Sequence, residues 1–160
     1  MANAVELTTV GYSASATFTP AASSHTAGDV VGGAKQFAFT DRNGVALPAG
    51  SQIKINSATM LAAGATNETA TWRLHLYSAT PPSAAADDAA YDLTSGDRAT
   101  YLGYFDFAQL VDLGSTLFIE ATPGKQLTLT SGSLFGYLTT LTTVTTAAID
   151  RTIRMHCTSV

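Results

Sequence analysis

The chain has 160 residues, of which 12% are charged, and its formal net charge is −4. Its 27 Ala, 25 Thr, 13 Ser and 13 Gly residues fill nearly half of all positions, which argues against a helical bundle because Thr, Ser and Gly are mediocre to poor helix formers. Low net charge combined with 46% apolar residues is the opposite of the signature of disorder, so we expect one folded domain.

Apolar and polar residues alternate in many short segments. The clearest is 71–77, where Trp72, Leu74 and Leu76 lie between more polar neighbours. A period of two predicts a β-strand with one face in the core and the other face wet or covered. The predicted strands, in chain order, are 14–18, 36–39, 53–56, 71–77, 104–107, 117–120, 127–130, 134–138 and 153–156.

Turn signals separate these strands, at 41–44, 48–50, 123–124 and 131–132, and Asn43-Gly44 is the strongest hairpin signal. Many short strands without a long helical pattern predict an all-β fold, an antiparallel β-sandwich of jelly-roll type, with a barrel as the alternative. We expect an N-terminal arm over 1–12 and a single β-sandwich domain over 13–160. Residues 1–9 show no strong hydrophobic period, so our hypothesis is that a neighbouring subunit holds the arm.

The segment 80–100 is too long for a hairpin and too polar for a core strand. Pro81 and Pro82 end the preceding strand, Ser83 is a good helix cap, and the Ala-rich run after it favours helix. The sequence therefore predicts one short helix over 83–90 inside a long loop.

Four carboxylates fall within this loop: Asp87, Asp88, Asp92 and Asp97. Their spacing differs from that of a calcium-binding loop, so they predict a solvated acidic loop. Asp92 and Asp97 are expected to accept hydrogen bonds from turn backbone, with Arg98 as an ionic partner.

No pattern of residues indicates catalysis, a cofactor or a metal. His75, His156 and Cys157 lack the paired spacing of zinc ligands, so we expect His75 on an outward strand face and Cys157 as a small apolar side chain. There is no G-x-S-x-G motif and no phosphate-binding glycine loop, and a glycosidase with paired carboxylates normally needs a deeper cleft than so short a chain forms. We therefore expect a protein that is not an enzyme.

Charge and hydropathy limit the partners. A pI of about 5.1 with singly scattered basic residues argues against nucleic acid, and no window approaches the roughly 18 apolar residues of a membrane span. A single cysteine and an N-terminus without signal-peptide features predict synthesis in a reducing cytoplasm.

Aromatic residues gather where the long loop ends. Phe105 and Phe107 alternate with polar neighbours and are expected in the core, whereas Tyr91 and Tyr101 are candidates for an interface because aromatic residues are enriched there.

Two stretches, 72–83 (WRLHLYSATPPS) and 89–104 (AAYDLTSGDRATYLGY), resemble small structural proteins of tailed bacteriophages, in particular capsid decoration, or cement, proteins. The resemblance implies a small β-rich domain, often a jelly roll, that binds the outer surface of the phage head. There it would stabilise the lattice by bridging major capsid subunits. It also implies assembly as a homodimer or homotrimer, and it supplies no catalytic residue.

The residues predicted to contact partners form two groups: Met1, Val5, Leu7 and Tyr12 in the arm, and Tyr77, Tyr91, Arg98 and Tyr101 around the long loop. Two alternatives remain open. One is a phage tail or neck structural protein. The other is a carbohydrate-binding host-recognition module, which predicts exposed aromatic platforms.

Overall fold

The computed structural model describes residues 10–64, 69–81 and 83–160, and in these residues the chain is all-β, with antiparallel sheets and no helix. The strands are β1 (Gly11–Phe18), β2 (Ser24–His25), β3 (Val30–Ala38), β4 (Thr40–Asp41), β5 (Gln52–Ala63), β6 (Trp72–Tyr77), β7 (Tyr101–Phe107), β8 (Val111–Asp112), β9 (Thr116–Ala121), β10 (Lys125–Thr128), β11 (Ser133–Thr140), β12 (Val144–Thr145) and β13 (Arg151–Ser159).

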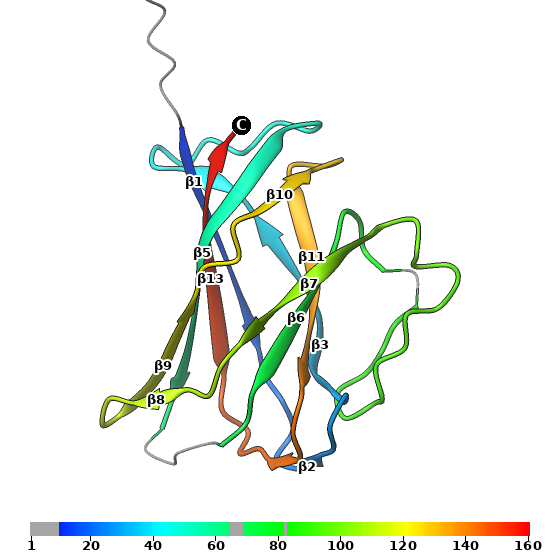
Figure 1. Ribbon diagram of the computed structural model, residues 1–160, viewed down its shortest axis with the longest axis vertical. Helices are drawn as coiled ribbons and strands as arrows, with labels where there is room; N and C mark the ends of the chain where they lie inside the picture. The colour runs from blue at the N-terminus through cyan, green and yellow to red at the C-terminus, as the bar shows by residue number, and fades with distance from the viewer. Residues whose placement is uncertain (1–9, 65–68, 82) are drawn as a thin grey trace, which may run out of the picture.

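Two main sheets organise the fold (Figure 1). The larger sheet has seven strands in the order β4-β1-β13-β5-β9-β8, with β10 also paired to β5. The smaller sheet has four strands in the order β3-β11-β6-β7, and β2 and β12 form a separate pair. The first long strand, β1, pairs antiparallel with the last, β13, along its whole length, so the two ends of the described chain lie in neighbouring strands.

The inner faces of the two main sheets share one apolar core. Phe18, Ile53 and Met155 of the larger sheet pack in the same cluster as Trp72 and Leu138 of the smaller sheet. This arrangement is sandwich-like, because each strand turns alternate side chains inward. The expectation that Phe105 and Phe107 belong to the core is confirmed.

The last strand shows how the sequence pattern produces this packing. Ile153, Met155 and Cys157 are buried, whereas Arg154 and His156 between them are exposed. Cys157 behaves as predicted, as a small apolar side chain, and burial raises the pKa of its thiol to about 12. The outer face of β13 is therefore polar and open.

Every predicted strand segment overlaps an observed strand. The boundaries differ most at 53–56 and 36–39: β5 continues seven residues further, to Ala63, and β3 begins six residues earlier, at Val30. The predicted turn at Asn43-Gly44 is confirmed: Gly44 has a φ of +79° and donates its N–H to the carbonyl of Asp41. The two-residue strands β2, β4, β8 and β12 were not predicted, because two residues are too few to show a period.

Two residues of the predicted arm, 11 and 12, belong to the sheet. Strand β1 begins at Gly11, and Tyr12 pairs with Cys157 on one side and Asp41 on the other, so Tyr12 belongs to the sheet. The other arm residues predicted to contact partners, Met1, Val5 and Leu7, lie outside the described residues.

Candidate interaction surfaces

Residues 80, 81 and 83–100, which we call the cover segment, lie on the outer face of the smaller sheet (Figure 1, green, right). The predicted helix over 83–90 is wrong: the described part of this range is not helical. Its backbone is bonded to the edge strand β3 instead, since Val30 donates to the Ala89 carbonyl at 2.8 Å and Asp88 donates to the Val30 carbonyl at 2.9 Å. These tertiary hydrogen bonds outweigh the helix propensity of the alanines.

The cover segment and the sheet enclose a second, smaller apolar cluster. Val30, Tyr77 and Tyr137 are buried at its centre, and Tyr91 and Leu93 of the cover segment pack against them. The Tyr137 hydroxyl donates to the Ser83 carbonyl at 2.8 Å and accepts from the Ala85 N–H at 3.1 Å. One buried tyrosine thus holds two backbone groups of the cover segment.

A stacked pair of rings closes this cluster. The Tyr91 ring lies over the His75 ring with 3.8 Å between the ring centroids, and its hydroxyl lies 2.6 Å from that of Tyr77. Burial raises the pKa of Tyr77 to about 12, and burial followed by the positive charge of Arg73 lowers the pKa of His75 to about 4. His75 is therefore neutral at pH 7, and it lies on the outward strand face as predicted, but covered.

Two of the four loop carboxylates fasten the cover segment. Asp97 is buried and accepts from the Ser83 N–H at 3.3 Å and the Thr94 hydroxyl at 3.1 Å, which confirms its predicted role in a turn. Asp92 and Arg98 are exposed, and the predicted ion pair of Arg98 does not form among the described residues. The prediction of a solvated acidic loop therefore holds only in part, because Asp87 and Asp97 accept hydrogen bonds from within the chain.

Asp87 joins the cover segment to the start of the chain. Its carboxylate accepts from the N–H of Ala21 at 2.7 Å and of Gly32 at 2.6 Å, and lies 3.2 Å from His25 Nε2. Partial burial by itself raises the pKa of Asp87, but these hydrogen bonds outweigh burial and hold the pKa below its usual range. Gly32 is required here because its φ is +72° and an added Cβ would lie 2.7 Å from the Thr19 nitrogen.

His25 was missed by the sequence reasoning. Its Nδ1 lies 3.2 Å from the Thr146 hydroxyl, so Thr146, His25 and Asp87 are connected in the order of a catalytic triad. Both His25 and Thr146 are buried, and the Thr146 hydroxyl donates to the Ala21 carbonyl at 2.9 Å. A substrate would have no access to this hydroxyl, so the arrangement ties β2, β12 and the cover segment together. Sequence spacing gives no signal for it, since the three residues are far apart in the chain.

The residues predicted to contact partners around the loop fall into different environments. Tyr77 is fully buried under the cover segment, so its side chain is not part of the surface, in contrast to the prediction. Tyr91 and Tyr101 are half-buried, and both use ring or hydroxyl contacts to His75. Arg98 is exposed.

Beyond the cover segment, the smaller sheet leaves a small surface that we call the aromatic shelf, formed by Arg73, Tyr104 and Asp106. Tyr104 is 47% exposed, and the Arg73 guanidinium lies 3.7 Å from its ring centroid. Arg73 donates from Nε and Nη2 to the two carboxylate oxygens of Asp106, at 2.7 and 3.0 Å. These hydrogen bonds raise the pKa of Arg73 and fix a planar cation on an exposed ring.

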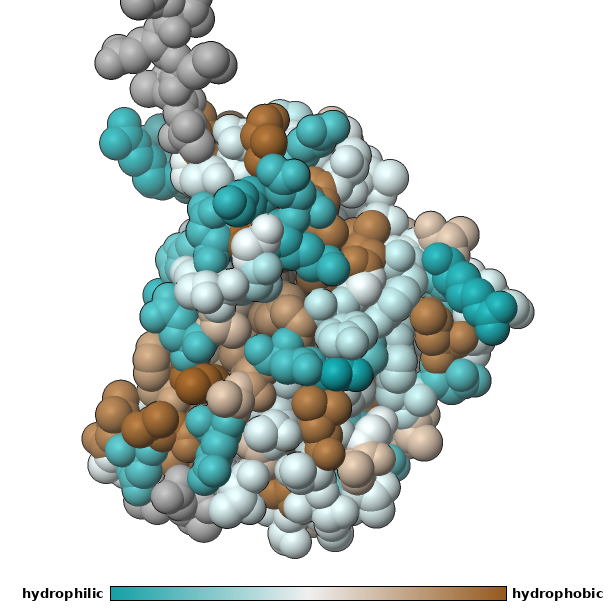
Figure 2. Space-filling model, viewed as in Figure 1, coloured by the Kyte–Doolittle hydropathy of each residue, from teal (hydrophilic) through white to brown (hydrophobic). Residues whose placement is uncertain are grey.

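An apolar surface of a different kind lies at the β8 edge of the larger sheet. Val111 is 54% and Leu113 is 64% exposed. Val111 pairs with Phe118, which pairs with Leu61, so apolar side chains continue across β8, β9 and β5. We call these four residues the apolar ridge, and Figure 2 shows apolar atoms gathered over β8 and β9 at the lower left.

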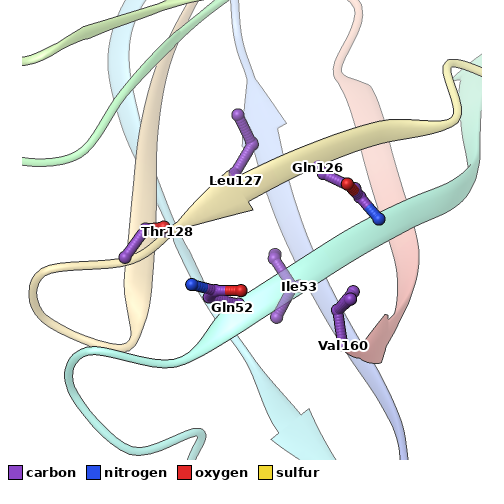
Figure 3. Close-up of a pocket in the computed structure, with 6 residues that line it drawn as sticks. All are labelled: Gln52, Ile53, Gln126, Leu127, Thr128 and Val160. Atoms are coloured by element: carbon purple, nitrogen blue, oxygen red, sulfur yellow. The ribbon is translucent and has the colours of Figure 1, made fainter.

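A shallow pocket of about 230 Å³ lies near the C-terminus, between β5, β10 and Val160 (Figure 3). Its lining combines Gln52, Gln126 and Thr128 with apolar side chains and contains no side chain that is Asp, Glu, His, Lys, Arg, Cys or Tyr. This lining offers hydrogen bonds, and it places no acidic or basic side chain beside the Thr128 hydroxyl.

Within the described residues, no group of three or more His, Cys, Asp or Glu side chains could hold a metal ion. The described part of the chain also contains no helix that could span a membrane. In comparisons with known proteins, no family model and no curated protein matches the chain.

Proposed function

We propose that this chain is a structural virion protein that binds the outer surface of a bacteriophage head and stabilises the capsid lattice by bridging major capsid subunits. The apolar ridge is the observation that carries the proposal. Val111 and Leu113 are exposed together at one edge of the larger sheet, whereas surface apolar residues that serve no contact are usually scattered singly.

We assign the apolar ridge to contact between copies of this chain, as a homodimer or homotrimer. The ridge includes Val111 of β8, which among the described residues is an edge strand paired with β9 alone, and an exposed edge with apolar side chains readily pairs with another chain. An oligomer binds a lattice through several copies at once, so weak contacts add up to strong attachment.

The strand orders support a jelly roll as the finer description of the fold. Taking the eight longer strands in chain order, β1, β5, β9 and β13 belong to the larger sheet, and β3, β6, β7 and β11 to the smaller one. The orders β1-β13-β5-β9 and β3-β11-β6-β7 are those obtained when a long antiparallel hairpin is rolled into two sheets. Such a fold presents two separate outer faces to different neighbours.

Electron cryo-microscopy of the virions that contain the chain tests the main proposal. We expect density of this domain on the outer head surface, bridging capsid subunits. Density confined to the tail or neck would overturn the head location in favour of a tail structural protein, and absence of the domain from virions would overturn the proposal altogether.

The oligomer is tested with Leu113→Lys and with Val45→Lys as the matched control, since Val45 is 61% exposed in the 41–44 turn region, away from the ridge. Sedimentation should show dissociation of Leu113→Lys and an unchanged oligomer for Val45→Lys. A Leu113→Lys protein of unchanged mass would overturn the role of the ridge.

The aromatic shelf favours a second candidate function, carbohydrate binding in host recognition. An exposed tyrosine beside fixed polar groups offers sugars both an apolar ring and hydrogen-bond partners. A glycan array would reveal binding that Tyr104→Ala abolishes and Val45→Ala leaves unchanged. Absence of binding to host surface glycans would overturn this function.

A further inference from the structure

A shallow trough crosses the outer face of the larger sheet at its β4 edge. Two adjoining hollows of about 410 and 330 Å³ form it, and both are lined by Ser13, Thr40 and His156. These three residues lie in one row, because Ser13 pairs with His156 of β13 and with Thr40 of β4. We call this surface the basic trough.

Cationic side chains lie at both ends of the row. Arg154 lines one hollow and Arg42 lines the other, and both are exposed, as is His156. The rest of the lining consists largely of hydroxyl and amide groups, including Ser15, Gln36 and Thr158, and neither hollow is lined by Asp or Glu. Hydroxyl, amide and guanidinium groups all donate hydrogen bonds.

The cations of the trough have no acidic partner among the described residues. The ion pairs of the described chain are His25 with Asp87 and Arg73 with Asp106, both outside the trough. Asp41 lies at the edge, but its Oδ1 accepts the N–H groups of Asn43 and Val45, each at 2.8 Å. Two uncompensated guanidinium groups in a chain of net charge −4 are a local excess of positive charge.

We propose that the basic trough binds an extended acidic segment of the major capsid subunit. Charge complementarity selects a carboxylate-bearing partner, and guanidinium groups pair with carboxylates through two parallel hydrogen bonds. Arg154 and His156 are two residues apart on one strand, so their side chains leave the sheet about 7 Å apart. Carboxylates at alternate positions of an extended peptide have the same spacing.

This inference rests on the proposed function and adds a division of labour to it. The basic trough takes its cations from the β4 edge and from β13, whereas the apolar ridge runs from the β8 edge to β5, so the two surfaces use different residues of one outer face. A copy that contacts other copies through the ridge therefore keeps the trough free for the lattice. Bridging requires two such separate surfaces.

The first test measures binding to heads assembled from the major capsid protein without this chain. Arg154→Glu should weaken binding at least about tenfold, because it places a carboxylate where the partner carries one. Lys54→Glu is the matched control: it makes the same charge change on an exposed residue of the same sheet, outside both linings, and should bind within about twofold of the wild type. Equal binding by wild type and Arg154→Glu would overturn the trough.

The second test does not depend on the heads, so failure of the proposed function is distinguishable from failure of the trough. Amide NMR spectra of the full chain are recorded with the peptide Glu-Thr-Glu-Thr-Glu, and with Lys-Thr-Lys-Thr-Lys as control. Shifts confined to the residues that line the two hollows, on β1, β4 and β13 and at Gln36, Ala38, Arg42 and Asn56, support the trough if they appear only with the acidic peptide and disappear in Arg154→Glu. Shifts elsewhere, none at all, or a stronger response to a sulfated disaccharide would overturn the acidic peptide as its occupant.

Discussion

The outer faces of the two main sheets differ in burial: one is covered by another segment of the chain, and the other is open. The smaller sheet turns His75, Tyr77 and Tyr137 outward, and the cover segment buries all three. The larger sheet turns Ser15 and Thr59 outward, together with Leu61 and Phe118 of the apolar ridge, and in the described structure all four remain exposed or half-buried. The polar atoms of a buried ring need partners within the chain, whereas exposed hydroxyl groups are satisfied by water.

The difference indicates which face is available for partners. On the smaller sheet Tyr137 bonds to Ser83 and Tyr77 to Tyr91, so these groups are used within the chain, while the aromatic shelf and the exposed Gln36 of β3 stay open. On the larger sheet the basic trough and the apolar ridge remain unused. The covered face uses its polar groups within the fold, and it is the open face that we propose for recognition.

The largest expected effect is on the covered face. Tyr77→Ala removes a fully buried ring beneath the cover segment and should lower the free energy of unfolding by about 3–5 kcal/mol. Tyr77→Phe is the matched control and should cost about 1 kcal/mol, the loss of the hydrogen bond to Tyr91. Urea denaturation measures both, and a Tyr77→Ala protein as stable as Tyr77→Phe would show that the second cluster does not hold the cover segment.

The next effect depends on pH. The pKa of His75 is about 4 in the folded chain against an ordinary value of 6.5, so between these values the unfolded chain binds more protons. Acidification from pH 6.5 to 4 should therefore remove up to about 3 kcal/mol of stability through His75. In His75→Gln this contribution to the pH slope should vanish, as measured by urea denaturation at pH 7, 5.5 and 4.5; identical slopes in both proteins would contradict it.

The residues behind these two effects also show which features could be predicted from the sequence and which could not. The alternation of Trp72, Leu74 and Leu76 is local, so it located β6 and the outward position of His75. The cover over His75 depends on hydrogen bonds between Val30 and residues 88–89. These residues are more than fifty positions apart in the chain, so no local sequence pattern predicts that they bond. Helix propensity therefore gave the wrong structure for 83–90.

The candidate surfaces divide in the same way. Tyr91 and Tyr101 were found because aromatic residues stand out in a sequence of small residues, yet burial of the neighbouring Tyr77 could not be seen. The basic trough was missed because Arg42 and Arg154 are distant in the chain. They come to lie on one surface because β1 pairs with both β4 and β13. To predict a surface that several paired strands form together, one must know the register of the strands, and the hydrophobic period does not give the register.

A smaller effect is expected where the cover segment is tied to the start of the chain. Asp87→Asn keeps the shape of the side chain but weakens its hydrogen bonds to Ala21, Gly32 and His25, and should cost about 2 kcal/mol at pH 7. Asp88→Asn is the control, since Asp88 is exposed with a φ of +65°, which Asn adopts readily. Equal stability of the two variants by urea denaturation would contradict a fastening role for Asp87.

The smallest expected effect on stability comes from replacing a threonine by valine on each of the two faces. Thr139→Val on the covered face removes the hydroxyl that lies 3.3 Å from His75 Nε2 and leaves a buried ring nitrogen unpaired, which should cost about 1–2 kcal/mol. Thr59→Val on the open face keeps the β-branched shape and loses only contacts with water, so stability should change by less than about 0.5 kcal/mol. Both values come from urea denaturation at pH 7. If Thr59→Val cost as much as Thr139→Val, the open face would also carry internal hydrogen bonds, and its polar groups would no longer be free for a partner.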